Sequence, residues 1–111
     1  MKTITWDEFE MIELRTGTII QVDNFLEARK PAYQITVDFG GDIGIKRSSA
    51  QITELYTRDT LIGKQIIGVV NFPPKQIGPF ISEFLITGFV SDWWVILAVP
   101  DMDCKNGLKL S

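Results

Sequence analysis

The residues best placed for chemistry lie where a run of β-branched residues ends. Residues 69–70 are both valine, and Asn71, Phe72, two prolines and Lys75 follow them. Proline has no backbone N–H to donate to a sheet, so the strand must stop and the chain must form a stiff segment. We call residues 71–77 the rim. An amide, an aromatic ring and a cation on a stiff rim indicate a binding site.

Other residues could complete this site. Cations suit contacts with phosphate, hydroxyl and amide groups suit hydrogen bonds to a base edge or a peptide backbone, and aromatic rings suit stacking on bases or contact with apolar side chains. The candidate site residues of these three kinds are Lys46, Arg47, Ser48, Ser49, Gln51, Asn71, Phe72, Lys75 and Phe80.

Several of these residues also have a structural interpretation. Phe72 could close one end of a core, because aromatic side chains bury large apolar areas. Ser48 or Ser49 could begin a helix, since serine is a preferred N-cap residue. Lys46 and Arg47 could form a solvated strand end. The sequence leaves both interpretations open for each residue.

The composition argues against an enzyme. The chain has no histidine and a single cysteine, Cys104. It therefore lacks Ser-His and Cys-His pairs, an imidazole base, a histidine-ligated metal and an intrachain disulfide. No carboxylate pair and no phosphate-binding glycine loop stands out. We expect a non-catalytic protein with no cofactor and no metal ion.

Length and charge set further limits. The 111 residues, 45% of them hydrophobic, are enough for one domain spanning residues 1–111. A net charge of −3 argues against non-specific coating of nucleic acid, although the basic pairs at residues 29–30 and 46–47 leave room for a small basic face. The N-terminus turns acidic where a signal peptide needs an apolar segment, and no apolar run approaches membrane length. We expect a cytoplasmic protein.

The order of the predicted elements indicates the fold. Thr5 and Glu8 fit a capping box, which predicts a short helix at residues 6–11 that covers one end of the core. Strands are expected at residues 14–22, 33–39, 43–48, 65–71 and 83–87, and a short helix capped by Ser49 is expected to follow the third strand and to run through residue 56. This order predicts a mainly all-β, five-stranded OB-fold barrel with a helix between strands three and four.

A further apolar strand is expected near the C-terminus. Residues 93–100 are too apolar to remain an exposed sheet edge, and a turn at Asn106 leads into a last short segment. On so short a chain, these residues favour an interface with a second subunit. We expect a homodimer with the N-terminal helix and the C-terminal extension in its interface, and we expect residues 93–110 to contribute much of the contact.

The chain also resembles a known family. The segments LRTGTI, VDFG, LIGK and VNFPPK, at residues 14–19, 37–40, 61–64 and 70–75, look like the tRNA-binding domain appended to some methionyl- and phenylalanyl-tRNA synthetases. Residues 43–53 and 71–77 are most similar to the family's stand-alone members, which are regarded as homodimeric, export-related chaperones. The resemblance implies an OB-fold homodimer that binds tRNA through the barrel face and the rim. The alternative that it implies is a chaperone for unfolded or precursor polypeptides.

Overall fold

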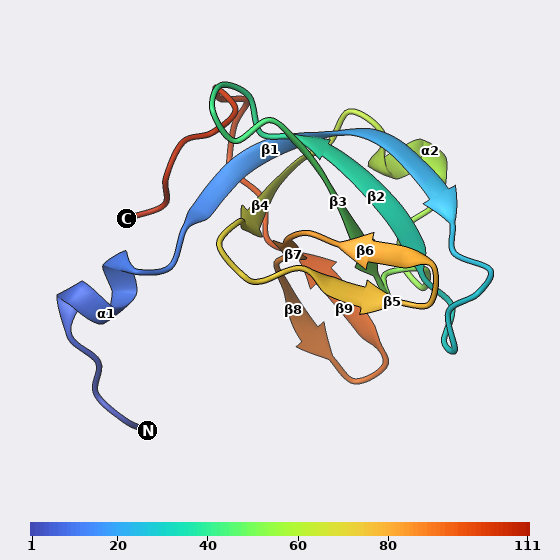
Figure 1. The fold of residues 1–111 in the computed structure, drawn as a ribbon, viewed down its shortest axis with the longest axis horizontal. Helices are drawn as coiled ribbons and strands as arrows, with labels where there is room; N and C mark the ends of the chain where they lie inside the picture. Colours follow the sequence, from blue (N-terminus) through green and yellow to red (C-terminus); the bar gives the residue numbers. More distant parts are fainter.

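The computed structural model describes all residues from Met1 to Ser111. The chain forms two short helices and nine strands (Figure 1). In chain order the elements are α1 (Trp6–Glu10), β1 (Leu14–Asn24), β2 (Tyr33–Asp38), β3 (Ile45–Ala50), α2 (Arg58–Leu61), β4 (Gln65–Val69), β5 (Lys75–Ile77), β6 (Phe80–Ser82), β7 (Leu85–Ile86), β8 (Gly88–Ser91) and β9 (Trp94–Leu97).

The main sheet is a nearly closed antiparallel barrel in the strand order β3-β2-β1-β4-β7. Strand β1 is long enough to serve two neighbours: residues 14–18 pair with β4, and residues 18–24 pair with β2. A register shift between Ile19 and Gln21 bends β1 where it passes from one neighbour to the other. The predicted five-stranded OB-fold, with a helix between its third and fourth strands, is confirmed.

The barrel closes between β3 and the segment that joins β6 to β7. The N–H of Glu83 donates to the carbonyl of Arg47 at 2.7 Å, and the N–H of Arg47 donates to the Glu83 carboxylate at 3.1 Å. The N–H of Ser49 donates to the hydroxyl of Ser82 at 3.3 Å. One backbone bond and two side-chain oxygens thus take the place of a regular strand partner along this edge of β3.

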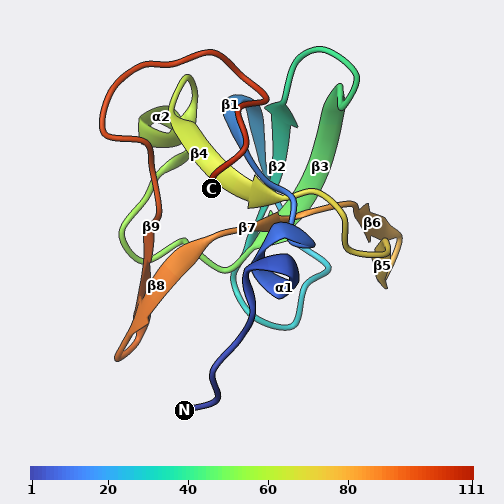
Figure 2. The same ribbon diagram turned by 90° about the vertical axis from the view of Figure 1, so that its left-hand side faces the viewer.

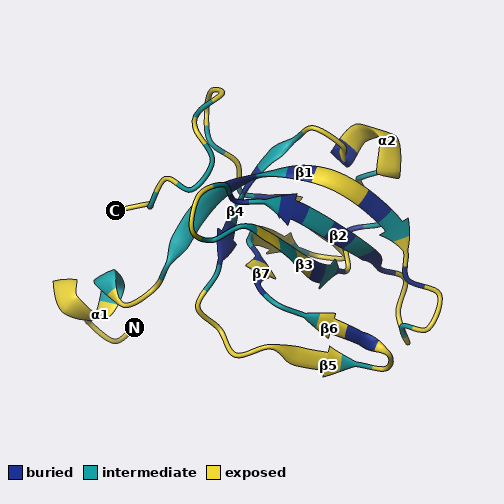
Figure 3. Ribbon diagram, turned by 45° about the horizontal axis from the view of Figure 1, so that its top comes forward, coloured by how far each residue is buried: buried dark blue, intermediate teal, exposed yellow.

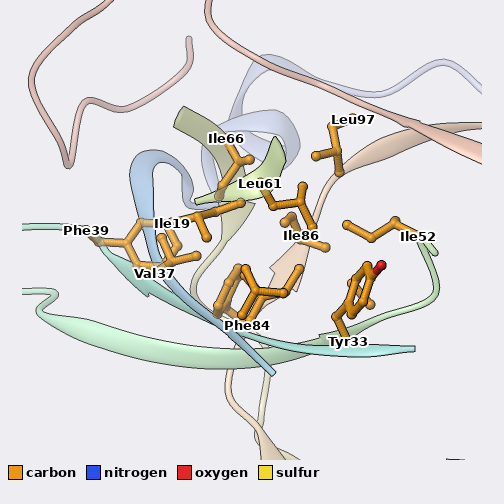
Figure 4. Close-up of a cluster of buried hydrophobic side chains, with 13 residues drawn as sticks. Ile19, Tyr33, Val37, Phe39, Ile52, Leu61, Ile66, Phe84, Ile86 and Leu97 are labelled. Atoms are coloured by element: carbon orange, nitrogen blue, oxygen red, sulfur yellow. The ribbon is translucent and has the colours of Figure 1, made fainter. Parts of the chain in front are cut away.

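The core fills the inside of the barrel (Figure 4). Phe39 is fully buried and packs edge-on against Phe84, with 5.0 Å between the ring centroids. Gly17 and Gly68 leave room for these rings, because a Cβ added at either glycine would lie within 2.9 Å of an atom of Phe39. Strand β2 alternates buried and half-buried residues, which confirms the period of two in its sequence.

The helix after β3 begins later than the sequence indicates. The residues around Ser49 continue as strand, and Ser49 pairs with Gln34 of β2. The predicted helix over residues 49–56 is therefore wrong in its bounds. Helix α2 starts instead after Thr57, whose hydroxyl accepts the N–H of Thr60. Pairing along the whole of β2 outweighs the capping preference of an isolated serine.

Helix α1 has the predicted cap but not the predicted position. The Thr5 hydroxyl accepts the N–H of Glu8, and the Glu8 carboxylate accepts the N–H of Thr5, which confirms the capping box. The helix has no buried residue, and it stands away from the barrel (Figure 1). The expectation that it covers one end of the core is wrong, because its aromatic residues Trp6 and Phe9 contact each other instead.

Two hairpins extend from opposite sides of the barrel (Figure 2). Strands β5 and β6 form one hairpin, whose turn contains Gly78 at a positive φ of 58°. Strands β8 and β9 form the other, with Asp92 in its turn at a φ of 37°. The expected apolar strand after residue 93 is therefore the second strand of a hairpin, and the chain itself pairs with its edge.

The C-terminal segment completes the edge of β1 that β2 does not reach. The N–H of Gly107 donates to the carbonyl of Thr16 at 2.7 Å, and the N–H of Thr16 donates to the carbonyl of Leu108 at 3.0 Å. The N–H of Leu110 donates to the carbonyl of Leu14 at 2.8 Å. The turn predicted at Asn106 leads directly into this pairing.

The longest helix has five residues, and none could cross a membrane.

Candidate binding groove

A groove of about 670 Å³ lies between the β5–β6 hairpin and the barrel. The rim supplies Phe72, Pro73, Pro74 and Lys75, and the barrel supplies Ser49 of β3 and other residues. The two prolines stop β4, so the chain leaves the barrel and returns as the hairpin. We call this space the rim groove. Figure 3 shows that β5, which follows the prolines, is largely exposed.

Two predicted site residues line the rim groove with exposed side chains, and a third, Ser49, lines it half-buried. Phe72 has an exposed fraction of 53%, so its ring is available to a ligand and does not close the core. Lys75 is exposed and forms no salt bridge. It is also the only charged residue that lines the groove. The rim groove thus combines one free cation with an accessible aromatic ring.

Asn71 stands at the start of the rim, but its side chain is already bound. Its Oδ1 accepts the N–H of Glu13 at 3.0 Å, and its Nδ2 donates to the carbonyl of Met11 at 2.7 Å. It is not among the residues that line the rim groove. The amide therefore attaches the rim to the segment that follows α1, and the structure gives Asn71 a structural contact where the sequence favoured ligand binding.

Phe80 is not an accessible stacking surface. Its exposed fraction is 4%, and it packs against Phe25 with 5.3 Å between the ring centroids. The Arg47 guanidinium lies 4.7 Å from the centroid of the Phe80 ring and donates to the side chain of Gln34. The prediction that Phe80 offers a free ring is wrong, because its hairpin folds back onto a small second core.

The remaining predicted residues are divided among different surfaces. Ser48 lines the groove but has an exposed fraction of 1%, and its hydroxyl donates to the carbonyl of Ser49. Lys46 and Arg47 are neighbours on β3, so their side chains point to opposite faces of the strand. Gln51 lies outside the rim groove, in an adjoining hollow. The structure therefore does not bring the three predicted cations together.

Two apolar residues of the rim groove, Phe84 and Leu85, are not among the site residues predicted from the sequence. They come from the segment that enters β7, where Phe84 is buried and Leu85 has an exposed fraction of 49%. Side chains alternate between the two faces of the predicted fifth strand, and this alternation could have identified Leu85 as a residue that faces outward.

No group of three or more histidine, cysteine, aspartate or glutamate residues is close enough to hold a metal ion.

A cluster of charges joins the two ends of the chain beside the rim. The Glu13 carboxylate lies 2.6 Å from the Arg15 guanidinium and 2.9 Å from the Lys109 ammonium, which also lies 3.4 Å from Glu10. Hydrogen bonds from Lys109 and Arg15 hold the pKa of the Glu13 carboxyl below its ordinary value of 4.5. The hydrogen bond to Glu13 raises the pKa of Lys109 above 10.5.

These pKa shifts predict a pH dependence of stability. A carboxyl whose folded-state pKa is depressed stabilises the fold above its unfolded value and loses that contribution as the pH falls through the folded value. We expect Glu13→Gln to lower the melting temperature at neutral pH, and we expect the difference from the wild type to shrink in acid, below the ordinary pKa of 4.5. Thermal unfolding between about pH 3 and about pH 8 measures this. Glu27→Gln, at an exposed residue without a salt bridge, is the control. A difference that is constant with pH would contradict the prediction.

Comparison with known proteins supports the assignment of the fold. Two solved CsaA chaperones superpose on the chain: that of Bacillus anthracis with a TM-score of 0.93 at 44% identity, and that of Picrophilus torridus with a TM-score of 0.92 at 50% identity. They cover 99% and 98% of this chain, and each is itself covered completely. The stand-alone chaperones that the sequence resembles are thus also similar in structure.

Curated relatives include methionine–tRNA ligases. The ligase of Leptospira biflexa is 36% identical over 104 residues, which are 94% of this chain and 15% of the ligase. The chain thus spans a small part of the length of these relatives, whose catalytic activity it need not share. Residues 14–109 match the family described as a putative tRNA binding domain. That match covers the whole barrel, the rim and the C-terminal segment, and the chain belongs to this tRNA-binding-domain family.

Proposed function

We propose that this protein is a non-catalytic binding domain that holds unfolded or precursor polypeptide segments in the rim groove. The observation that carries the proposal is the chemistry of the groove, where Phe72, the two prolines, Ile77 and Leu85 surround a single cation. Apolar side chains of an unfolded chain gain free energy when such a surface removes them from water. The proposal places this activity in the cytoplasm, on clients that include precursors for export.

The similarity to CsaA chaperones supports the same proposal. Two such structures match this chain from end to end, at 44% and 50% identity. Phe72 and Leu85 are both about half exposed and line the same groove. Surfaces of this kind commonly bind other polypeptides.

Binding of tRNA is a second candidate, and the family match favours it. Lys75 could contact a phosphate, and Phe72 could stack on an unpaired base. Non-specific affinity for nucleic acid depends on the number of cations that neutralise phosphates. Because Lys46 and Arg47 do not line the rim groove, a tRNA held there would meet one cation. Tight tRNA binding would then need other surfaces of the protein.

One titration separates the two ligands. The protein is titrated with a reduced, carboxymethylated polypeptide that cannot refold and, separately, with total tRNA, each at low and at high salt. We expect Phe72→Ala to weaken polypeptide binding about tenfold at both salt concentrations, because the ring supplies apolar area. Lys75→Ala should affect only tRNA. If tRNA binds with a steep salt dependence and the polypeptide does not bind, tRNA is the ligand and the proposal is wrong.

We also propose that the protein is a homodimer. The register of the β8–β9 hairpin places Phe89, Trp94 and Ile96 on one face, with exposed fractions of 68%, 39% and 46%. Ser91 is the only other residue of this face within the two strands, so the face is without charge. A surface without charge can meet its own copy across a twofold axis without repulsion. A second copy of the chain is the occupant that we propose.

Sedimentation measures the association. We expect a dimer at micromolar concentration and a monomer for Phe89→Glu, because the symmetric contact would bury two unpaired carboxylates. Leu26→Glu is the control, since Leu26 is 87% exposed in the loop after β1. A wild-type protein that sediments as a monomer would refute the proposal.

A further inference from the structure

The rim groove continues into two adjoining hollows. A second hollow of about 470 Å³ lies between the end of β3 and β7–β8, and it shares Ser49 and Leu85 with the rim groove. A third hollow of about 500 Å³ shares Gln51, Val90 and Val95 with the second. We call the three together the track. It leads from the rim along the end of β3 to the tip of the β8–β9 hairpin.

The track passes Gln51, the first residue after β3. Earlier along β3, the outer edge is occupied: Glu83 bonds both backbone groups of Arg47, and Ser82 accepts the N–H of Ser49. Two residues later, the backbone N–H and carbonyl of Gln51 form no hydrogen bond. Gln51 lines both the second and the third hollow. Unpaired backbone groups directly after a strand can extend its edge and pair with another extended backbone.

The middle of the track has the wrong chemistry for a nucleic acid. None of the residues that line the second hollow is charged, and Ile52, Leu85, Val90 and Val95 make much of it apolar. A phosphodiester backbone placed there would lose water without meeting a cation. A peptide backbone is neutral and can pair with a strand edge, while its alternate side chains enter an apolar hollow.

The far end of the track holds an exposed tryptophan. Trp93 has an exposed fraction of 87% and lines the third hollow beside Trp94, a residue of the proposed dimer face. Lys30, Glu54 and Asp92 line the same hollow, so charges of both signs stand beside the rings. This end can accept a large apolar side chain and can pair with a charged one next to it.

We propose that the track binds an extended, strand-forming polypeptide segment that adds to the open end of β3. The backbone of the segment bonds to Gln51, and its apolar side chains contact Leu85 in the middle of the track and Trp93 at its end. This inference rests on the polypeptide binding proposed above and narrows it. We therefore expect the track to bind segments that can form a strand more tightly than segments that are only apolar.

A matched pair of variants tests the backbone contact. Gln51→Pro removes the unpaired N–H, whereas Gln51→Ala keeps it and removes only the side chain. The probe is a fluorescein-labelled synthetic peptide of alternating valine and threonine with terminal lysines. We expect Gln51→Pro to weaken its binding about tenfold and Gln51→Ala to leave it within about twofold. The same peptide with alternate backbone amides N-methylated should bind about tenfold more weakly than the unmodified peptide. Melting temperatures are measured for both variants, and the peptide modification tests the contact without altering the protein.

A second pair of variants tests the far end. Trp93→Ala should weaken the binding of the valine–threonine peptide about tenfold. The control is Leu26→Ala, which should not change the affinity, because Leu26 is as exposed as Trp93 but does not line the track. If Trp93→Ala binds like the wild type, or if N-methylation has no effect, the track is refuted. If Phe72→Ala still weakens the carboxymethylated polypeptide in that case, the rim groove proposal survives. If the wild type binds neither probe, both proposals are wrong.

Discussion

Replacing Phe39 with alanine is expected to lower the free energy of unfolding by about 3–5 kcal/mol, a large share of the stability of a domain of this size. The Phe39 ring is fully buried and packs edge-on against Phe84. Gly17 and Gly68 lie against the same ring and have no side chain that could fill the space. The vacated volume would therefore remain a cavity, because the surrounding strands cannot collapse into it. Denaturant unfolding measures the loss.

The control for this core substitution is Leu26→Ala. Leu26 has an exposed fraction of 87%, so its truncation should change the free energy of unfolding by no more than about 0.5 kcal/mol. If Phe39→Ala has the same denaturant slope as the wild type, both proteins expose the same surface area on unfolding. A shift of the midpoint then reports a change in stability. A loss below about 1 kcal/mol for Phe39→Ala would mean that the barrel repacks around the missing ring, contrary to the prediction.

The second large effect is expected from Leu85→Glu, which should weaken the binding of unfolded polypeptides at least tenfold, or about 1.4 kcal/mol. Leu85 is 49% exposed and lines both the rim groove and the second hollow. A carboxylate there removes apolar contact area and loses its own hydration when a client covers it. Fluorescence anisotropy with the carboxymethylated polypeptide measures the affinity.

Ile81→Glu is the matched control for the groove. Ile81 has an exposed fraction of 51% and lies on β6 of the neighbouring hairpin, but it lines neither the rim groove nor the two adjoining hollows. Ile81→Glu adds the same negative charge as Leu85→Glu, at a residue with nearly the same exposed fraction. An equal loss of affinity in both variants would show that net charge, and not the groove, controls binding.

Local patterns were enough to predict the barrel. The alternation in β2 and the reciprocal hydrogen bonds of Thr5 and Glu8 involve residues close in sequence, and both were predicted correctly. The order of the strands then leaves few ways to pair them. Ser49 shows the limit of such patterns, because its place in β3 depends on β2, which lies earlier in the chain.

The candidate site was predicted only in part, because its chemistry depends on contacts across the fold. The prolines located the rim, and Phe72 and Lys75 line its groove. Asn71 and Phe80 have the residue types of a ligand site, but distant partners occupy the amide and bury the ring. The β5–β6 hairpin brings Arg47 onto the Phe80 ring, and no feature of the sequence near Arg47 reveals this contact.

The pairing of the C-terminal segment with β1 has a consequence for how the protein is made. The bonds of Gly107, Leu108 and Leu110 join residues 107–110 to a strand that begins at Leu14. During synthesis this part of the β1 edge stays unpaired until residues 107–110 have left the ribosome, and contacts between residues so far apart in sequence form slowly. A protein that we propose to bind unfolded segments therefore passes through a stage in which its own β1 has an unpaired edge.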